Sequence, residues 1–363
     1  MKKTLKNILF VTIPMLLVLF LLLEIISRIF FPGSDVPKTI YDDKDALVKY
    51  SREYGKRGTW STGNLAQQRG KWRINNDGWN SPIDYDSAKT PGVTRVAVIG
   101  DSYIEAWQVD AEKNYPALLG KSLGDKYQVY SFGVSGSPLS QYLHVSRYVE
   151  KKYSPDIYIF NLVHNDFHES IKGMAYIPQF MTIQMDNDST FQEIQPVKPE
   201  RTHNKVPGGI ILRKSSLFRY VYYNLHLMDR FRSKKAGAKE VEMNVAVSDV
   251  ADKQDTLRPV AKYIIGRIQT ELGAKKVIFV MDGPRRNIYQ GDLEKSKTKQ
   301  LNTMVDSITH QLNLPFIDLT PYMVKDYQQN KKRFESDYDN HWAEYGHQFV
   351  ANVLYQYFKN NKL

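Results

Sequence analysis

From Val93 onward, short apolar runs alternate with segments of helical periodicity, and this alternation restricts the fold more than any other feature of the sequence. Five runs rich in β-branched and aromatic residues are typical of buried strands: 95–99, 127–132, 156–163, 276–281 and 315–319. The expected helices lie at about 111–124, 138–152, 258–273, 294–312 and 342–359. Strands that alternate with helices form a parallel sheet covered on both faces, so we expect an α/β fold with a doubly wound sheet.

The amino terminus predicts a membrane anchor. Residues 8–23 carry no charge, and the apolar stretch continues past Glu24 and Arg28 to Phe31. A helix over 8–31 would span about 36 Å, enough to cross a bilayer with Glu24 near an interface. Three preceding lysines predict a cytoplasmic amino end, and no small-residue cleavage site follows. We therefore expect residues 1–31 to form a cytoplasmic tip and an uncleaved transmembrane signal anchor. A cleaved signal peptide is the alternative.

Residues 32–92 are polar and interrupted by glycine and proline. We expect a stalk and irregular N-terminal segment here, followed by one α/β domain over 93–363. An insertion at about 167–257 separates the third strand from the next helix and contains the aromatic, basic segment 212–223. That segment has helical periodicity, so we expect a surface helix packed on the domain, with a lid or docking face as the alternative.

Composition restricts the chemistry. The chain has no cysteine, which excludes disulfides, a thiol nucleophile and thiolate metal sites. Its formal net charge of +11 indicates a solvated basic surface, with attraction to anionic headgroups or cell-wall polymers as the alternative. We expect no nucleic-acid partner, because both interpretations of the amino terminus place the domain outside the cytoplasm.

Polar and glycine-rich segments follow four of the expected strands, at the edge where open α/β sheets bind ligands. A hydroxyl there is a nucleophile only if a base removes its proton, and Ser102 is the candidate. His341 is the best base because imidazole titrates near neutral pH, and Asp339 would orient it, with Asp337 as a weaker alternative. The segments involved are 100–102, 133–138, 164–166 and 282–286, together with 337–342 ahead of the last helix.

Attack on an ester carbonyl creates an oxyanion that needs pre-placed donors. The candidates are the backbone N–H of Ser102, the backbone N–H of Gly136 and the side-chain amide of Asn165. Each residue also has a structural interpretation. Gly-Asp-Ser is a common helix cap, a lone glycine marks a loop, Asn165 could cap a helix, and His341 could be an ordinary core or surface histidine.

Other ligand chemistry has weaker support in the sequence. Arg285 and Arg286 could contact an anionic substrate, or they could be ordinary surface arginines. Two sets of closely spaced histidines and aspartates could bind a metal, but neither has the His-Glu-x-x-His pattern, and no phosphate-binding glycine-rich loop with its lysine is present. We therefore expect neither a metal nor a nucleotide. The two sets are His164, Asp166 and His168, and Asp339, His341 and His347.

The order of these residues resembles that of the SGNH or GDSL-like hydrolases over about 93–363. Four motifs carry the resemblance: Gly100-Asp-Ser-Tyr103, Val134-Ser-Gly136, His164-Asn-Asp166 and Asp339-Asn-His341-Trp342. The resemblance implies Ser102 as nucleophile, Gly136 and Asn165 as oxyanion donors, and a base at His341 in the last motif. It also implies a flavodoxin-like three-layer sandwich, activity on ester bonds and no cofactor.

Two motifs depart from the usual pattern of that family. Val163 and His164 precede Asn165, where the usual third block is Gly-x-Asn-Asp. Tyr338 occupies the position three residues before His341, where the usual last block has aspartate. The Asp-x-His-Trp form is instead similar to membrane-associated members that acetylate exopolysaccharides, including the alginate acetylation proteins.

These features together predict an SGNH-type serine esterase in the cell membrane, with one span and its catalytic domain on the periplasmic or extracellular side. Its expected substrates are O-acyl esters, acetyl above all, of an envelope glycan or lipid. An O-acyltransferase that moves an acetyl group to a cell-envelope polysaccharide is the first alternative. A catalytically inactive glycan-binding envelope protein is the second. The acyl group, the acceptor and any protein partner remain open.

Overall fold

The computed structural model describes residues 2–53, 56–187, 190–199, 213–225, 241–242, 245–246 and 253–363. Its centre is a five-stranded sheet in the order β13-β12-β7-β5-β6, and every neighbouring pair is parallel. The expected strands and the doubly wound sheet are therefore confirmed. The strands are β5 (Thr94–Gly100), β6 (Tyr127–Gly133), β7 (Ile157–Leu162), β12 (Lys276–Met281) and β13 (Phe316–Asp318).

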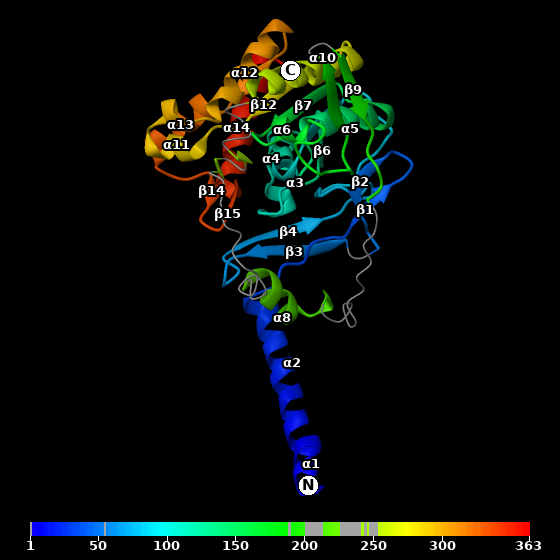
Figure 1. The fold of residues 1–363 in the computed structure, drawn as a ribbon, viewed down its shortest axis with the longest axis vertical. Coiled ribbons are helices and arrows are strands. Elements are labelled where there is room, and N and C mark those ends of the chain that lie inside the picture. Colours follow the sequence, from blue (N-terminus) through cyan, green and yellow to red (C-terminus); the bar gives the residue numbers. More distant parts are fainter. Residues whose placement is uncertain are drawn as a thin grey trace.

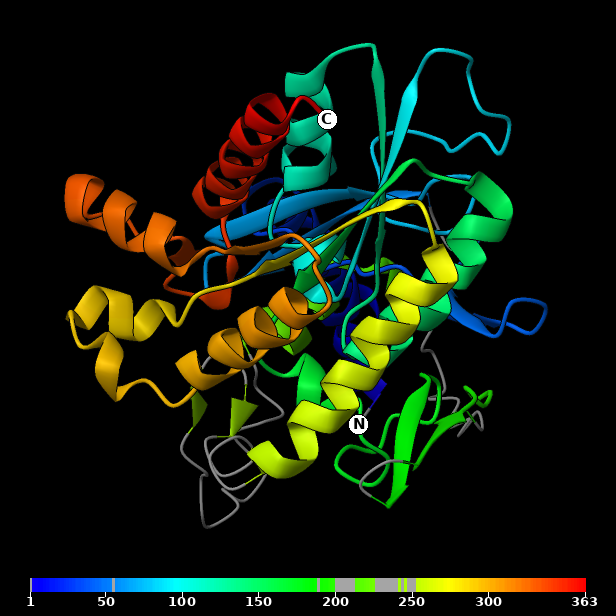
Figure 2. The ribbon, with the colours of Figure 1, turned by 90° about the horizontal axis from the view of Figure 1, so that it is seen from above.

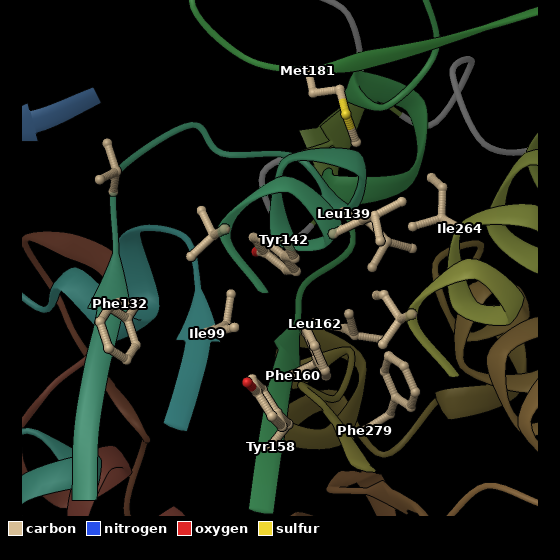
Figure 3. Packing of buried hydrophobic residues seen from close by; sticks show 14 of the residues in the cluster. Ile99, Phe132, Leu139, Tyr142, Tyr158, Phe160, Leu162, Met181, Ile264 and Phe279 are labelled. Carbon is tan, nitrogen blue, oxygen red and sulfur yellow. The ribbon is translucent and has the colours of Figure 1, made fainter. Parts of the chain in front are cut away.

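Helices cover both faces of the sheet, which makes the domain a three-layer sandwich (Figure 2). One face carries α4 (Tyr115–Leu123), α13 (Thr320–Asn330) and α14 (Glu344–Asn361), and the other carries α5 (Leu139–Tyr153), α10 (Gln254–Leu272) and α12 (Lys299–Gln311). Alternation along β5 divides the core, since Val96 and Val98 face one layer while Ala97 and Ile99 face the other. Figure 3 shows the second layer, where Ile99, Phe132 and Phe160 lie beneath α5.

The segment 32–92 is not the irregular stalk that its polar composition suggests. It forms two antiparallel pairs, β1 (Thr39–Asp42) with β2 (Leu47–Tyr50), and β3 (Arg57–Thr62) with β4 (Gln68–Arg73). Aromatic residues scattered among the polar ones are buried in the main core. The Trp79 ring, for example, meets Phe132 of β6 edge-on at 5.3 Å. These aromatic contacts attach the segment to the domain.

A long helical segment extends away from the domain at the amino end (Figure 1). It consists of α1 (Lys2–Asn7), a π-helical turn (Ile8–Thr12) and α2 (Ile13–Phe30). The part from Ile8 to Phe30 is long and apolar enough to cross a membrane, and its large side chains are exposed. Among the residues that the structure describes, this helix is the one candidate membrane span, and it lies at the expected place.

The insertion between β7 and α10 is partly described. A hairpin of β8 (Thr182–Asn187) and β9 (Thr190–Ile194) packs on the domain, where Arg147 of α5 pairs with Glu193 at 2.7 Å. The expected helix is present as α8 (Ser216–Arg219), continued by a π-helical turn (Tyr220–Asn224). Leu212 and much of the remaining insertion lie outside the described residues, and β10 (Val241–Glu242) pairs with β11 (Val245–Ala246).

Short elements gather at the carboxyl ends of the parallel strands. α3 (Ser102–Glu105) follows β5, α6 (Asp166–Glu169) follows β7, and α11 (Arg285–Gln290) follows β12. A small antiparallel pair, β14 (Glu335–Ser336) and β15 (Asp339–Trp342), precedes α14. These elements carry the residues singled out in the sequence.

Candidate active site

Ser102 begins helix α3 directly after the central strand β5. The Asp101 carboxylate caps this helix by accepting the backbone N–H of Tyr103 at 3.0 Å. The turn lies tightly against β6, because a Cβ on Gly133 would come within 2.3 Å of the Glu105 backbone nitrogen. The Ser102 side chain remains partly exposed at the sheet edge. The expected capping geometry and the exposed hydroxyl therefore occur together.

His341 and Asp339 lie on β15 and reach Ser102 across 239 positions of sequence. The imidazole Nε2 lies 2.8 Å from Ser102 Oγ, and Nδ1 lies 2.6 Å from Asp339 Oδ1. The same carboxylate oxygen accepts the His341 backbone N–H at 2.8 Å, which fixes the carboxylate beside the ring. Asp337, the weaker alternative, instead pairs with Arg333 at 3.1 Å. The structure thus places hydroxyl, imidazole and carboxylate in one hydrogen-bonded row.

The two charged groups of this row shift each other's titration. Burial alone would lower the pKa of His341, but the hydrogen bond and charge of Asp339 outweigh it and raise that pKa above 6.5. Burial likewise opposes ionisation of Asp339, yet the hydrogen bonds from His341 hold its pKa below the usual value. His347 behaves differently, because burial lowers its pKa to about 3. Of these two histidines, only His341 can change charge near neutral pH.

This coupling predicts the pH dependence of activity. A base must be neutral to accept a proton, so kcat/KM is expected to rise with pH through an apparent pKa above 6.5. Asp339→Asn removes the negative charge and should move this midpoint to lower pH while also slowing the reaction. Initial rates across pH test this for each variant. Glu169→Gln is the control, because burial raises the pKa of Glu169 to about 7. A midpoint that follows Glu169 and ignores Asp339 would contradict the assignment.

The three candidate oxyanion donors lie at the ends of neighbouring strands. Gly100 of β5 is in register with Gly133 of β6, and β7 borders β5 on its other side. Gly136 has a φ of +76°, a conformation that favours glycine. The side-chain amide of Asn165 donates to Glu169 at 3.0 Å, which leaves its second N–H for another acceptor. The fold therefore brings these donors to one rim, and Asn165 has a carboxylate neighbour that the sequence pattern did not indicate.

Glu105 is a buried carboxyl that the sequence analysis missed. It accepts the Ser135 backbone N–H at 2.9 Å, and it also binds the hydroxyls of Ser135 and Tyr50. Glu105 therefore holds the loop that carries Gly136. Burial raises its pKa from 4.5 to about 7. No short motif marks such a residue, because its partners, Tyr50 of β2 and Ser135 of the loop after β6, are distant from it in the sequence.

The raised pKa of Glu105 makes folding stability depend on pH. Its folded pKa exceeds the unfolded one, so its contribution to stability is complete below pH 4.5 and is lost as pH rises through about 7. The Gln side chain in Glu105→Gln cannot ionise. The free energy of unfolding of this variant, relative to wild type, should therefore increase by about 3 kcal/mol from acidic pH to pH 8. Urea unfolding at both pH values measures this. The exposed Glu112→Gln is the control, and an equal change in both variants would refute the expectation.

Arg285 fits neither interpretation that the sequence left open, because it is neither a substrate-facing residue nor a surface arginine. Its side chain is 2% exposed and pairs with Glu335 at 2.7 Å and Asp282 at 3.2 Å. It also donates to the Tyr103 hydroxyl at 2.7 Å and to the Asn340 carbonyl at 2.5 Å. Because Asn340 directly precedes the histidine, Arg285 supports the loop that carries it. Neither interpretation anticipated this role, because the carboxylate partner of Arg285 on β14 lies 50 residues away in the sequence.

The sequence neighbours of Arg285 and His341 differ in their placement. Arg286 is exposed, so a contact with an anionic substrate remains a prediction. The indole N–H of Trp342 donates to Asp282 at 3.1 Å, and the Tyr103 ring meets the Trp342 ring edge-on at 4.8 Å. Burial raises the pKa of Asp282 to about 6 although Arg285 lies beside it. Trp342, which follows His341, thus attaches β15 to Asp282 and Tyr103.

Within the part of the chain that the structure describes, no group of three or more histidines and carboxylates is arranged to hold a metal ion. His164 is buried and lies 3.0 Å from the Asn302 side-chain oxygen. His347 accepts the backbone N–H of Tyr115 at 3.3 Å. His164 and His347, one from each of the two closely spaced sets, therefore have separate partners in the fold.

Comparisons with known proteins give one family match and several similar solved structures. Residues 98–349 match the family model described as the GDSL-like Lipase/Acylhydrolase family. Similar solved structures include an aryl esterase from M. smegmatis, with 14% identity, a TM-score of 0.37 and coverage of 74% of this chain and 99% of that one. A lipase/acylhydrolase from Enterococcus faecalis has 12% identity and a TM-score of 0.40, with 74% and 97% covered. A catalytic mutant of an acetylxylan esterase from Geobacillus stearothermophilus has 11% identity and a TM-score of 0.38, with 74% and 95% covered. No curated protein matches the sequence.

Proposed function

Since the chain belongs to the GDSL-like lipase/acylhydrolase family and is an enzyme acting on ester bonds, we propose that it uses Ser102 as nucleophile, His341 as base and Asp339 as orienting carboxylate. One observation carries this proposal. The imidazole bridges the serine hydroxyl at 2.8 Å and the carboxylate at 2.6 Å. This is the geometry that serine acyl transfer requires, because the base must reach the nucleophile while its other nitrogen is held.

The reaction then follows from the positions of these atoms. Ser102 Oγ attacks the ester carbonyl carbon while His341 Nε2 takes its proton. The developing oxyanion is held by the N–H groups of Ser102 and Gly136 and by the free N–H of Asn165. As the tetrahedral intermediate collapses, the imidazolium returns the proton to the leaving alcohol and an acyl-serine remains. His341 then activates the hydroxyl that attacks this ester and releases the acyl group.

The setting suggests the substrate class. An N-terminal apolar helix that crosses the cell membrane would hold the domain on the periplasmic or extracellular side. Of the two interpretations of the net charge of +11, attraction to anionic headgroups or polymers is the one that would add to this placement. The proposed substrates are therefore O-acyl esters, acetyl above all, of envelope glycans or lipids.

A second candidate function is O-acyl transfer to a cell-envelope polysaccharide. It differs only in the acceptor, which is a sugar hydroxyl in place of water. The Asp-x-His-Trp motif favours it, and Trp342 of this motif is buried and bonded to Asp282 beneath the site.

Acyl-enzyme trapping on the full-length protein in detergent tests both candidates. With p-nitrophenyl acetate we expect a burst of p-nitrophenol and an acetyl group on the peptide containing Ser102, detected by mass spectrometry after acid quenching. Adding envelope oligosaccharides should then either leave acetate as the product or give an acetylated sugar. These two outcomes separate hydrolase from transferase. If there is neither burst nor adduct, both proposals fall and the glycan-binding alternative is favoured.

A further inference from the structure

Glu24 lies inside the apolar span, and its carboxylate is fully engaged by the insertion. It accepts the Ser215 hydroxyl at 2.6 Å and the backbone N–H groups of Ser216 and Leu217 at 2.9 and 3.0 Å. Arg28, one turn further along α2, adds an ion pair at 2.7 Å. A carboxylate in a membrane span is costly unless its lone pairs are satisfied. The start of α8 supplies the hydrogen bonds that satisfy the carboxylate. It must therefore lie at the same depth in the membrane as Glu24.

Aromatic contacts place α8 along the outer turns of the span. The rings of Phe20 and Phe218 lie 5.9 Å apart, and those of Phe31 and Tyr220 also lie 5.9 Å apart. Phe20 is about 6 Å further into the span than Glu24, at the usual helical rise. A hydrocarbon core of about 30 Å counted from Ile8 ends near residue 27. Phe218 therefore lies below the surface of any bilayer that the span crosses.

The outward side of this segment has the composition of a membrane interface. Phe218, Tyr222 and Tyr223 are 42%, 56% and 49% exposed, and the exposed Arg213 and Lys214 precede them. Aromatic rings and basic side chains gather at the headgroup level of membranes, where the rings are half-solvated and the charges meet anionic lipids. Next to a span of exposed apolar side chains, this patch continues the same lipid-facing surface.

We propose that residues 213–224 form a second membrane contact, embedded in the outer boundary of the bilayer that holds the anchor. This inference rests on the proposed membrane span. The segment binds the lipid headgroup layer, because the patch is continuous with the span. Its aromatic and basic groups lie at the depth set by Glu24 and Phe20.

The contact fixes the domain above the membrane. Gly33 is clamped between the anchor and α8, since its N–H donates to Ser216 Oγ at 3.2 Å and a Cβ there would meet the Tyr220 nitrogen at 2.3 Å. Asn224 bonds in turn to Ser61 of β3 at 3.2 Å.

The catalytic rim is connected to the same support. Ser336 of β14 donates to Gln68 of β4 at 2.5 Å, and Figure 1 shows β3 and β4 between α8 and the β14–β15 pair. The candidate catalytic histidine on β15 is thus tied to the membrane through two hairpins. This arrangement keeps the active-site rim on the membrane-facing half of the domain.

Single-site labelling tests the proposal, and the cysteine-free chain makes it clean. Tyr222→Cys, Leu17→Cys and Asn360→Cys variants of the full-length protein would each carry the fluorophore NBD in liposomes containing phosphatidylglycerol. Leu17 is 59% exposed on the span, and Asn360 is exposed near the distal carboxyl end. Lipids with a doxyl quencher near the headgroup or deep in the chain report depth. Tyr223→Cys serves as a second site, and circular dichroism checks folding.

We expect the label at position 222 to lose most of its emission to the shallow quencher, the label at 17 to the deep quencher, and the label at 360 to neither. If 17 is quenched and 222 and 223 behave like 360, the anchor stands and the second contact is wrong. If 17 also escapes quenching, the anchor itself fails. Protection of 222 from aqueous iodide without quenching by lipid would assign the patch to a protein partner and overturn the lipid proposal.

Discussion

Alanine in place of Ser102 should lower kcat for ester hydrolysis by roughly 10⁴- to 10⁶-fold, because loss of the proposed nucleophile leaves only the oxyanion donors and substrate binding. The variant should fold normally, since the partly exposed side chain makes its contacts within the site. Steady-state kinetics with p-nitrophenyl acetate on full-length protein measures the change. Ser87→Ala, at an exposed position before β5, is the matched control and should retain wild-type kcat.

A double variant tests whether Ser102 and His341 act as one catalytic unit or contribute independently to the rate. His341→Ala alone should cost about as much as Ser102→Ala, and the double variant should be hardly slower than either single one, because the residues of such a unit are strongly non-additive. Independent effects would instead multiply. If Ser102→Ala keeps most of the activity, or if the two losses multiply, the hydroxyl and imidazole do not act together despite the 2.8 Å between them.

The central sheet was predictable because its signal is local. β5 is a run of β-branched and small residues ended by Gly100, and parallel strands buried on both faces have this pattern. Ser102 was also predictable as a site residue, because it follows β5 at the edge of the sheet where ligands bind. Its pairing with His341, which lies ahead of the last helix, was predictable from the residue types, because a hydroxyl nucleophile needs a base that titrates near neutral pH. For this one pair the sequence indicated the contact, and the structure shows that 2.8 Å separates His341 Nε2 from Ser102 Oγ.

The features that the sequence analysis did not predict involve residues whose partners are distant in the sequence and belong to no motif. Trp72 and Trp79 stand in a polar, glycine-containing segment. Only the tertiary fold shows that the Trp107 ring packs against Trp72, and that Phe132 of β6 and Tyr148 of α5 pack against Trp79. Glu105 follows Ser102 by three residues, yet its role depends on Tyr50 and Ser135. Local propensity contains no information on such pairings, because burial and charge partners are set by packing.

Arg285→Met should destabilise the domain by about 3–5 kcal/mol, the usual cost of removing one partner from a buried ion pair. Methionine keeps much of the volume but leaves the buried Asp282 without its cation. Urea unfolding at pH 8 measures the loss. The adjacent Arg286→Met is a matched control at an exposed position, and it should change the free energy of unfolding by no more than about 0.5 kcal/mol.

The loss of stability in Arg285→Met should also depend on pH. The titration of Asp282 determines whether the loss grows or shrinks as pH rises. Burial holds the pKa of Asp282 at about 6 even beside Arg285, and removing the cation must raise it further. A carboxyl whose folded pKa is raised loses its contribution to stability as pH rises through that value, so the deficit of Arg285→Met should grow from pH 5 to pH 8. Adding Asp282→Asn should recover part of the stability at pH 8 and little at pH 5. A deficit that ignores both pH and the second substitution would mean that Arg285 acts by packing alone, and its contacts with Asp282 and Glu335 would then contribute little.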